Sequence, residues 1–198
     1  MATTVPDTTP QPRAIWRYNN VAVALHWTMA ALIVGQIGLG IYFHEMPPSP
    51  AKGELFTWHK TLGVTILALT LARIAWRLTH RPPPYPVEMP RWERVAGVWN
   101  HRIFYALMLA LPVTGLLILS GGDRGETTEL LGGITIPLVP GVPESVGEWA
   151  EQAHKLGAVL WIGLILLHVA AALKHQWWDK YETSGRMPPF VPPTERTE

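Results

Sequence analysis

Four apolar runs, each long enough to cross a lipid bilayer, alternate with shorter polar segments along this chain. In the last run, the stretch from Leu156 to Leu173 has no charged residue and no proline, and eighteen such residues are typical of a membrane-crossing helix. The pattern therefore predicts an all-α integral membrane protein, a four-helix bundle. Its helices are expected at about residues 21–43, 56–78, 100–119 and 150–178.

Polar, proline-rich segments flank and join these runs. The first twenty residues lack the apolar centre of a signal peptide, so we expect the first run to remain as a membrane span. We assign residues 1–14 to a disordered tail, 15–186 to one transmembrane domain and 187–198 to a C-terminal tail. The piece ITIPLVP, before the last run, is too short to cross and should lie against the outer face.

Composition supports the membrane assignment and narrows the chemistry. Only 16% of the residues are charged, against about 25% in soluble domains. The ten tryptophans suit an aromatic belt at the membrane surface. With no cysteine, the chain cannot form disulfides, thiolate-ligated iron–sulfur clusters or the thioether links of c-type haem. We expect membrane lipid around the bundle and no nucleic-acid partner.

The basic residues predict the orientation. Twelve of the sixteen Lys and Arg lie in the N-terminal segment, the connection between the second and third runs, or the C-terminal segment, helix ends included. The other two connections and their helix ends hold Lys52, Lys60, Arg124 and Lys155. Positive residues favour the cytoplasmic side, so both termini should be cytoplasmic.

Histidines mark two depths within the predicted bundle. His154 and His168, on the last helix, are about 40° apart around the axis and roughly 21 Å apart along it. His26 should lie at the inner depth of His168, and His59 at the outer depth of His154. Each depth therefore offers two imidazoles from different helices, the arrangement that a bis-histidine haem requires.

Several of these side chains also have simpler interpretations. A histidine near a helix end is often an ordinary interfacial residue, and His44 and His80 are expected to be solvated. His101 could contact a propionate of the inner haem, although an interfacial role is favoured. Arg73 faces the inner depth and could pair with a propionate, or could extend to the membrane surface.

The whole pattern resembles the bacterial cytochrome b561 family of four-helix, di-haem inner-membrane proteins. The matching segments are LHW around His26, WHKTLG around His59, NHRIFYALMLALPVTG, HKLGAVL at His154, and LHVAAALKH from His168 to His175. The resemblance covers about residues 17–186. It implies two haems b, with His26 and His168 binding the inner one and His59 and His154 the outer one. It also implies a multi-pass protein of the bacterial inner membrane.

Within that family, the chain is most similar to the superoxide oxidase type. That similarity implies oxidation of superoxide at the periplasmic face and reduction of ubiquinone as electron acceptor. It places His175 at the quinone site, although His175 could equally be an interfacial residue. Lys60 and Lys155 directly follow the two outer ligands and could stabilise the approaching anion, or be ordinary interfacial lysines.

Two alternatives remain open. The outer connections carry four basic and eight acidic residues, a formal charge of −4, which disfavours the capture of superoxide. Acidic loops would suit a basic partner, so the chain could instead be a cytochrome b subunit linking quinol to a periplasmic redox protein. A haem-free metal transporter or a structural membrane protein is the third class, since histidines in a bundle also bind zinc or copper.

Overall fold

The computed structural model describes residues 17–85, 89–123, 125–179 and 186–188. Over these ranges it has four long helices, each long and apolar enough to cross a membrane, which confirms the predicted all-α bundle. They are α1 (Asn20–His44), α2 (Pro50–Thr79), α3 (Arg91–Ser120) and α4 (Glu144–Lys174). The predicted tail of residues 1–14 lies outside the described residues, as does most of the C-terminal tail.

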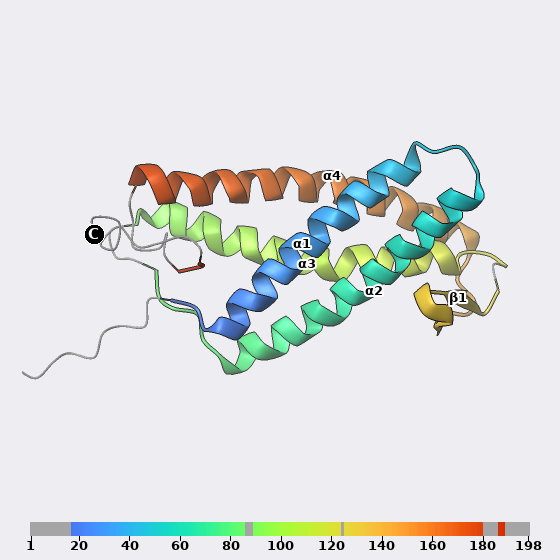
Figure 1. Cartoon of the computed structure of the whole chain (residues 1–198), viewed down its shortest axis with the longest axis horizontal. Helices are drawn as coiled ribbons and strands as arrows, with labels where there is room; N and C mark the ends of the chain where they lie inside the picture. Colours follow the sequence, from blue (N-terminus) through green and yellow to red (C-terminus); the bar gives the residue numbers. More distant parts are fainter. Residues whose placement is uncertain (1–16, 86–88, 124, 180–185, 189–198) are drawn as a thin grey trace, which may run out of the picture.

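The helices run antiparallel to their sequence neighbours (Figure 1). Helix α1 packs along α2, α3 packs along α4, and the two hairpins meet mainly through α2 and α3. One end of the bundle holds the start of α1 and the end of α4, and we name it the Asn20 end. The opposite end carries a small β-hairpin and is named the hairpin end.

Three helices begin earlier than hydropathy predicts, at Pro50, Arg91 and Glu144. Hydropathy detects only the part of a helix that lies in hydrocarbon, whereas these first turns are polar. Local signals explain the start of α2, because Ser49 accepts a hydrogen bond from the Lys52 backbone N–H and proline occupies the first helical position. Helix α4 is followed by a π-helical turn, η2 (His175–Asp179).

The buried core is small because the outer faces of the helices are apolar and suited to lipid. Leu166 and Leu167 on α4, for example, are 66% and 61% exposed. The core is a layer of apolar side chains from all four helices: Met29, Ile33, Ile66, Met108, Leu111 and Trp161. Trp161 is seven residues from both His154 and His168, so this layer separates the two histidine depths.

Two glycines allow α3 and α4 to approach closely near the hairpin end. A Cβ on Gly121 would lie 2.8 Å from the Gly147 Cα, and one on Gly147 would lie 3.0 Å from the Gly121 Cα. Contacts of this kind between small residues are common in membrane helix pairs, because they let backbones meet. The contact fixes the position of α4 two turns before His154.

The hairpin end is covered by a short two-stranded sheet that hydropathy did not predict. Strand β1 (Thr127–Glu129) pairs antiparallel with β2 (Thr135–Pro137), across the turn η1 (Leu131–Gly133). The segment ITIPLVP supplies β2. Two bonds attach the sheet to α2: Lys60 Nζ donates to Thr128 Oγ1 at 2.8 Å, and the Leu131 N–H donates to Thr61 Oγ1 at 3.0 Å.

Candidate functional site

The histidines that were paired by depth face each other in two pairs. At the hairpin end, the ring centroids of His59 on α2 and His154 on α4 are 6.2 Å apart. Toward the Asn20 end, those of His26 on α1 and His168 on α4 are 6.4 Å apart. All four side chains are half-buried. Both pairs therefore include α4 and one helix of the α1–α2 hairpin.

A hydrogen bond from α3 orients His154. Its Nδ1 lies 3.0 Å from the Leu111 carbonyl oxygen and 3.1 Å from the Thr114 hydroxyl oxygen. The Thr114 hydroxyl itself donates to the Leu111 carbonyl, so the imidazole Nδ1–H donates to that oxygen as well. Nδ1 then carries the proton, and Nε2 has a lone pair for a metal.

His59 lies in a space that small and aromatic residues shape. Its backbone carbonyl accepts a hydrogen bond of 3.0 Å from Gln36 Nε2, and its ring packs against Phe43 at 5.2 Å. A Cβ on Gly40 would lie 3.1 Å from His59 Cε1, so glycine leaves room for the imidazole. His59 Nδ1 is buried and has no hydrogen-bond partner among the described residues. A buried ring nitrogen of this kind fits a group that the protein side chains do not supply.

The second pair is enclosed by residues of α3. His168 contacts the rings of His101 and Phe104, each with a centroid distance of 5.4 Å, and Asn100 Nδ2 lies 3.4 Å from its Nδ1. His101 Nδ1 donates to the Gly97 carbonyl at 2.6 Å. His101 was interpreted as an interfacial residue or a propionate contact, and the structure places it beside the inner pair.

Arg73 lies toward the Asn20 end, where its Nε donates to the Tyr105 hydroxyl at 3.1 Å. It lines a cavity of about 530 Å³ between the Asn20 end of α1, α2 and α3. Three further arginines line the same cavity: Arg17, Arg77 and Arg81. With no acidic residue in this lining, the cavity suits carboxylates such as propionates.

Both lysines that follow the hairpin-end histidines already have partners. Lys60 is bound to Thr128 in the β-hairpin, as described above, and Lys155 pairs with Glu151 at 2.7 Å. The side chains of Lys155 and Glu151 are 50% and 49% exposed, so this ion pair adds little stability. Of the two positive charges next to the hairpin-end pair, that of Lys155 is thus compensated by a carboxylate.

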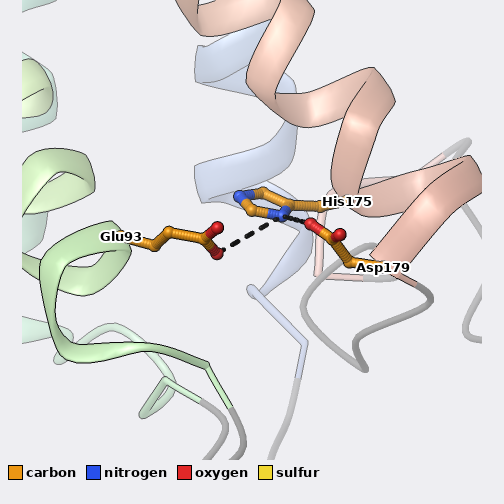
Figure 2. A group of neighbouring side chains, drawn as sticks. All are labelled: Glu93, His175 and Asp179. Carbon is orange, nitrogen blue, oxygen red and sulfur yellow. Dashed lines mark hydrogen bonds and ion pairs between the residues drawn. The ribbon is translucent and has the colours of Figure 1, made fainter.

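His175 lies in the π-helical turn and contacts two carboxylates that the sequence interpretation missed (Figure 2). Its Nδ1 is 2.8 Å from Asp179 Oδ2 and 4.0 Å from Glu93 Oε2. The spacing of four residues on one helix could have indicated Asp179. Glu93 is on α3, and no local pattern connects it to His175.

The distance between the two rings of each histidine pair can be compared with that expected for two imidazoles bound to one metal ion. An imidazole nitrogen binds a metal at about 2 Å, and the ring centre lies about 1 Å behind it, so two opposed imidazoles have centres about 6 Å apart. Both observed spacings, 6.2 and 6.4 Å, fit that value. Two further observations agree with a bound group at this level: Gly40 leaves room for the His59 ring, and His59 Nδ1 is unpartnered among the described residues. Facing imidazoles inside an apolar helical bundle are the arrangement with which a membrane cytochrome holds haem.

The chain belongs to the prokaryotic cytochrome b561 family, whose model matches residues 17–189. Membership confirms the family resemblance of the sequence motifs. The protein is accordingly a multi-pass protein of the bacterial inner membrane that transfers electrons, in a family that binds haem b.

Curated relatives cover nearly the whole chain. Cytochrome b561 homolog 2 of Escherichia coli (strain K12) is 29% identical over 182 residues, which are 86% of this chain and 90% of the relative. The probable superoxide oxidase CybB of Yersinia pestis is 28% identical over 174 residues, 87% of this chain and 96% of the relative. Cytochrome b561 homolog 1 of Escherichia coli (strain K12) is 25% identical over 176 residues, 87% and 97% of the two chains.

Proposed function

We propose that the chain holds two haems b and passes electrons from superoxide to ubiquinone. His59 and His154 would hold the outer haem, and His26 and His168 the inner one. The observation that carries this proposal is the spacing of about 6 Å within each pair, in a bundle with a family match. Haem iron, when bound, supplies one-electron oxidation and reduction.

The residues of the chain orient the ligands and keep water away. The Leu111 carbonyl fixes the proton of His154 on Nδ1, so Nε2 is the nitrogen that would bind the haem iron. The apolar layer around Trp161 excludes water between the two levels. Arg73 and the other arginines of its cavity would bind the inner propionates.

The orientation follows from the distribution of charge. We infer that the Asn20 end is cytoplasmic, because it carries most of the basic residues, and that the hairpin end is periplasmic. In that orientation the outer haem faces superoxide and His175 lies on the cytoplasmic side, within reach of a quinone in the membrane. Two superoxide anions become two O₂, and their two electrons with two protons convert ubiquinone to ubiquinol. The name of the relative from Yersinia pestis supports this choice of donor.

Stopped-flow mixing of the purified haem-loaded protein with superoxide tests the proposed reaction. Haem absorbance should rise to the reduced form without quinone, and should return to the oxidised form once a soluble ubiquinone analogue is added. Ubiquinol should form in a ratio of one for every two superoxide anions consumed. A protein that binds haem but is not reduced by superoxide would contradict the proposed donor while leaving the haem ligands intact.

A second candidate is an electron-transfer subunit that links quinol to a periplasmic redox partner. The charge of Lys155, which is compensated by Glu151, and the acidic outer connections together favour a basic protein at the hairpin end. The electron-transfer subunit is favoured if ubiquinol reduces the haems and superoxide does not. Electron transfer from superoxide to ubiquinone is favoured if the reaction proceeds with these two substrates and no further protein.

Reversing the charge of the two outer lysines tests whether they attract superoxide. The double change Lys60→Glu and Lys155→Glu should slow haem reduction by superoxide on the order of tenfold at low salt, because a negative entrance repels an anion. The difference should shrink at high salt, where charges are screened. Stopped-flow rates over a salt series provide the measurement.

Two matched variants separate charge from structure in this experiment. Lys52→Glu makes the same charge change as Lys60→Glu alone, at a residue that does not adjoin a haem ligand in the sequence, and should slow haem reduction less than that single variant. Lys60→Gln removes the charge but retains a hydrogen-bond donor for Thr128. Equal rates in the wild type and the double variant at low salt would exclude anion capture by these lysines.

A further inference from the structure

Three metal-ligating side chains meet where the first turn of α3 approaches the π-helical turn after α4. Glu93 comes from α3, and His175 and Asp179 come from η2 (Figure 2). One ligand atom from each, His175 Nδ1 and a carboxylate oxygen of Glu93 and of Asp179, lie within 4.8 Å of one another. The group is separate from the four histidines that face each other across the bundle.

One oxygen of this group is buried without a partner. The Glu93 side chain is only 8% exposed, and its Oε2 has no hydrogen-bond partner among the described residues. This oxygen points toward His175 Nδ1, 4.0 Å away, as Figure 2 shows. A buried carboxylate oxygen that has lost its water without gaining a partner is destabilising, so the position favours an added cation.

Lys174 compensates the group incompletely. Its ammonium donates to Glu93 Oε1 at 3.1 Å and to Asp179 Oδ2 at 2.5 Å, but it does not donate a hydrogen bond to Glu93 Oε2. Two carboxylates and one ammonium leave a formal charge of −1 when His175 is neutral. The Lys174 side chain is 49% exposed, so it can move into solvent and make room for another cation.

We propose that Glu93, His175 and Asp179 form a binding site for a divalent transition-metal ion of the Zn²⁺ type. Imidazole nitrogen and carboxylate oxygen both bind Zn²⁺, and water can take a fourth position beside three protein ligands. Tetrahedral ligands at about 2 Å from the metal lie about 3.3 Å from each other. The observed distances from His175 Nδ1, 2.8 Å to Asp179 and 4.0 Å to Glu93, lie on either side of that value.

The proposed metal ion binds His175 at Nδ1, not at Nε2. Binding at His175 Nδ1 replaces its hydrogen bond to Asp179, and in the neutral ring the proton moves from Nδ1 to the other ring nitrogen, Nε2. In Figure 2 both dashed lines run to Nδ1, and none runs to Nε2. A quinone contact of His175 at Nε2 is therefore compatible with a metal at Nδ1, and the metal would bridge α3 and η2 there.

Zinc titration of the haem-loaded full-length protein, stripped of metal with a chelator, tests the site. Equilibrium dialysis against Zn²⁺, with elemental analysis of zinc and haem iron, should show one zinc per chain that Glu93→Gln or Asp179→Asn weakens by at least about tenfold. Glu148→Gln removes an exposed carboxylate elsewhere on α4 and should bind zinc like the wild type. Lys174→Met should tighten binding, because it removes the competing ammonium.

The opposite effects of Lys174→Met and Glu93→Gln distinguish a metal site from a purely structural cluster. If the wild type, Glu93→Gln and Asp179→Asn bind the same amount of zinc at the same affinity, the proposal is wrong. It is also wrong if Lys174→Met weakens zinc binding, because Lys174 would then support the site. The measurement involves neither superoxide nor ubiquinone, so its outcome is independent of the proposed reaction.

Discussion

Replacing His168 with alanine should leave about one haem per chain instead of about two and should abolish ubiquinone reduction. The remaining haem, held by His59 and His154, should still be reduced by superoxide. The reason is geometric: His168 faces His26 across 6.4 Å, whereas the other pair lies on the far side of the apolar layer. The change removes one of the two imidazoles that would hold the inner haem and leaves both residues of the outer site in place.

The reciprocal change, His154→Ala, should remove the outer haem and with it the reduction by superoxide. Haem content from the pyridine haemochrome spectrum and stopped-flow reduction together measure both variants. His44→Ala is the matched control, because His44 is an exposed histidine at the end of α1 and should not affect haem content. If either variant retained the wild-type haem content, or if both lost all haem while remaining folded, the proposed pairs would be wrong.

Gly121→Ala should produce the largest loss of stability among single glycine changes. The new Cβ would lie 2.8 Å from the Gly147 Cα, and backbone atoms cannot move aside as the end of a flexible side chain can. Separating α3 from α4 at this point should lower the free energy of unfolding by about 1–3 kcal/mol. His154 lies two turns beyond Gly147 on α4, so the outer haem should be lost at a lower temperature than the inner one.

Gly163→Ala provides a control of opposite sign on α4. A Cβ at Gly163 meets no described atom within 4 Å, and alanine favours a helix over glycine by about 0.5–1 kcal/mol. Thermal midpoints at one fixed scan rate, followed by haem absorbance and tryptophan fluorescence, compare the two variants. A Gly121→Ala midpoint equal to or above that of the wild type would show that the α3–α4 contact is not tight.

The sequence predicted the helices well where they lie in hydrocarbon and poorly beyond it. Apolar runs identify spans directly, because lipid imposes a continuous length requirement. The starts at Pro50, Arg91 and Glu144 were missed because these first turns are polar. Strands β1 and β2 are only three residues each, and their pairing depends on contacts with α2 that no periodicity reports.

The candidate site could likewise be predicted from the sequence only in part. Depth along a helix follows from residue counting, so the sequence alone is enough to pair His26 with His168 and His59 with His154. The environment of each ring could not be predicted. The Leu111 carbonyl next to His154 and the Glu93 carboxylate next to His175 come from helices that are distant in sequence, and only packing brings them together.

The apolar layer around Met29 and Trp161 has an electrical consequence. The histidine levels on either side of it are about 21 Å apart along α4, within a hydrocarbon core about 30 Å thick. An electron that moves from one level to the other crosses roughly two thirds of the membrane potential. With the Asn20 end inside, inward transfer runs toward the negative side and is opposed by about 1.6 kcal/mol per 100 mV. A large membrane potential would therefore oppose inward electron transfer, and depolarisation of the membrane would remove that opposition.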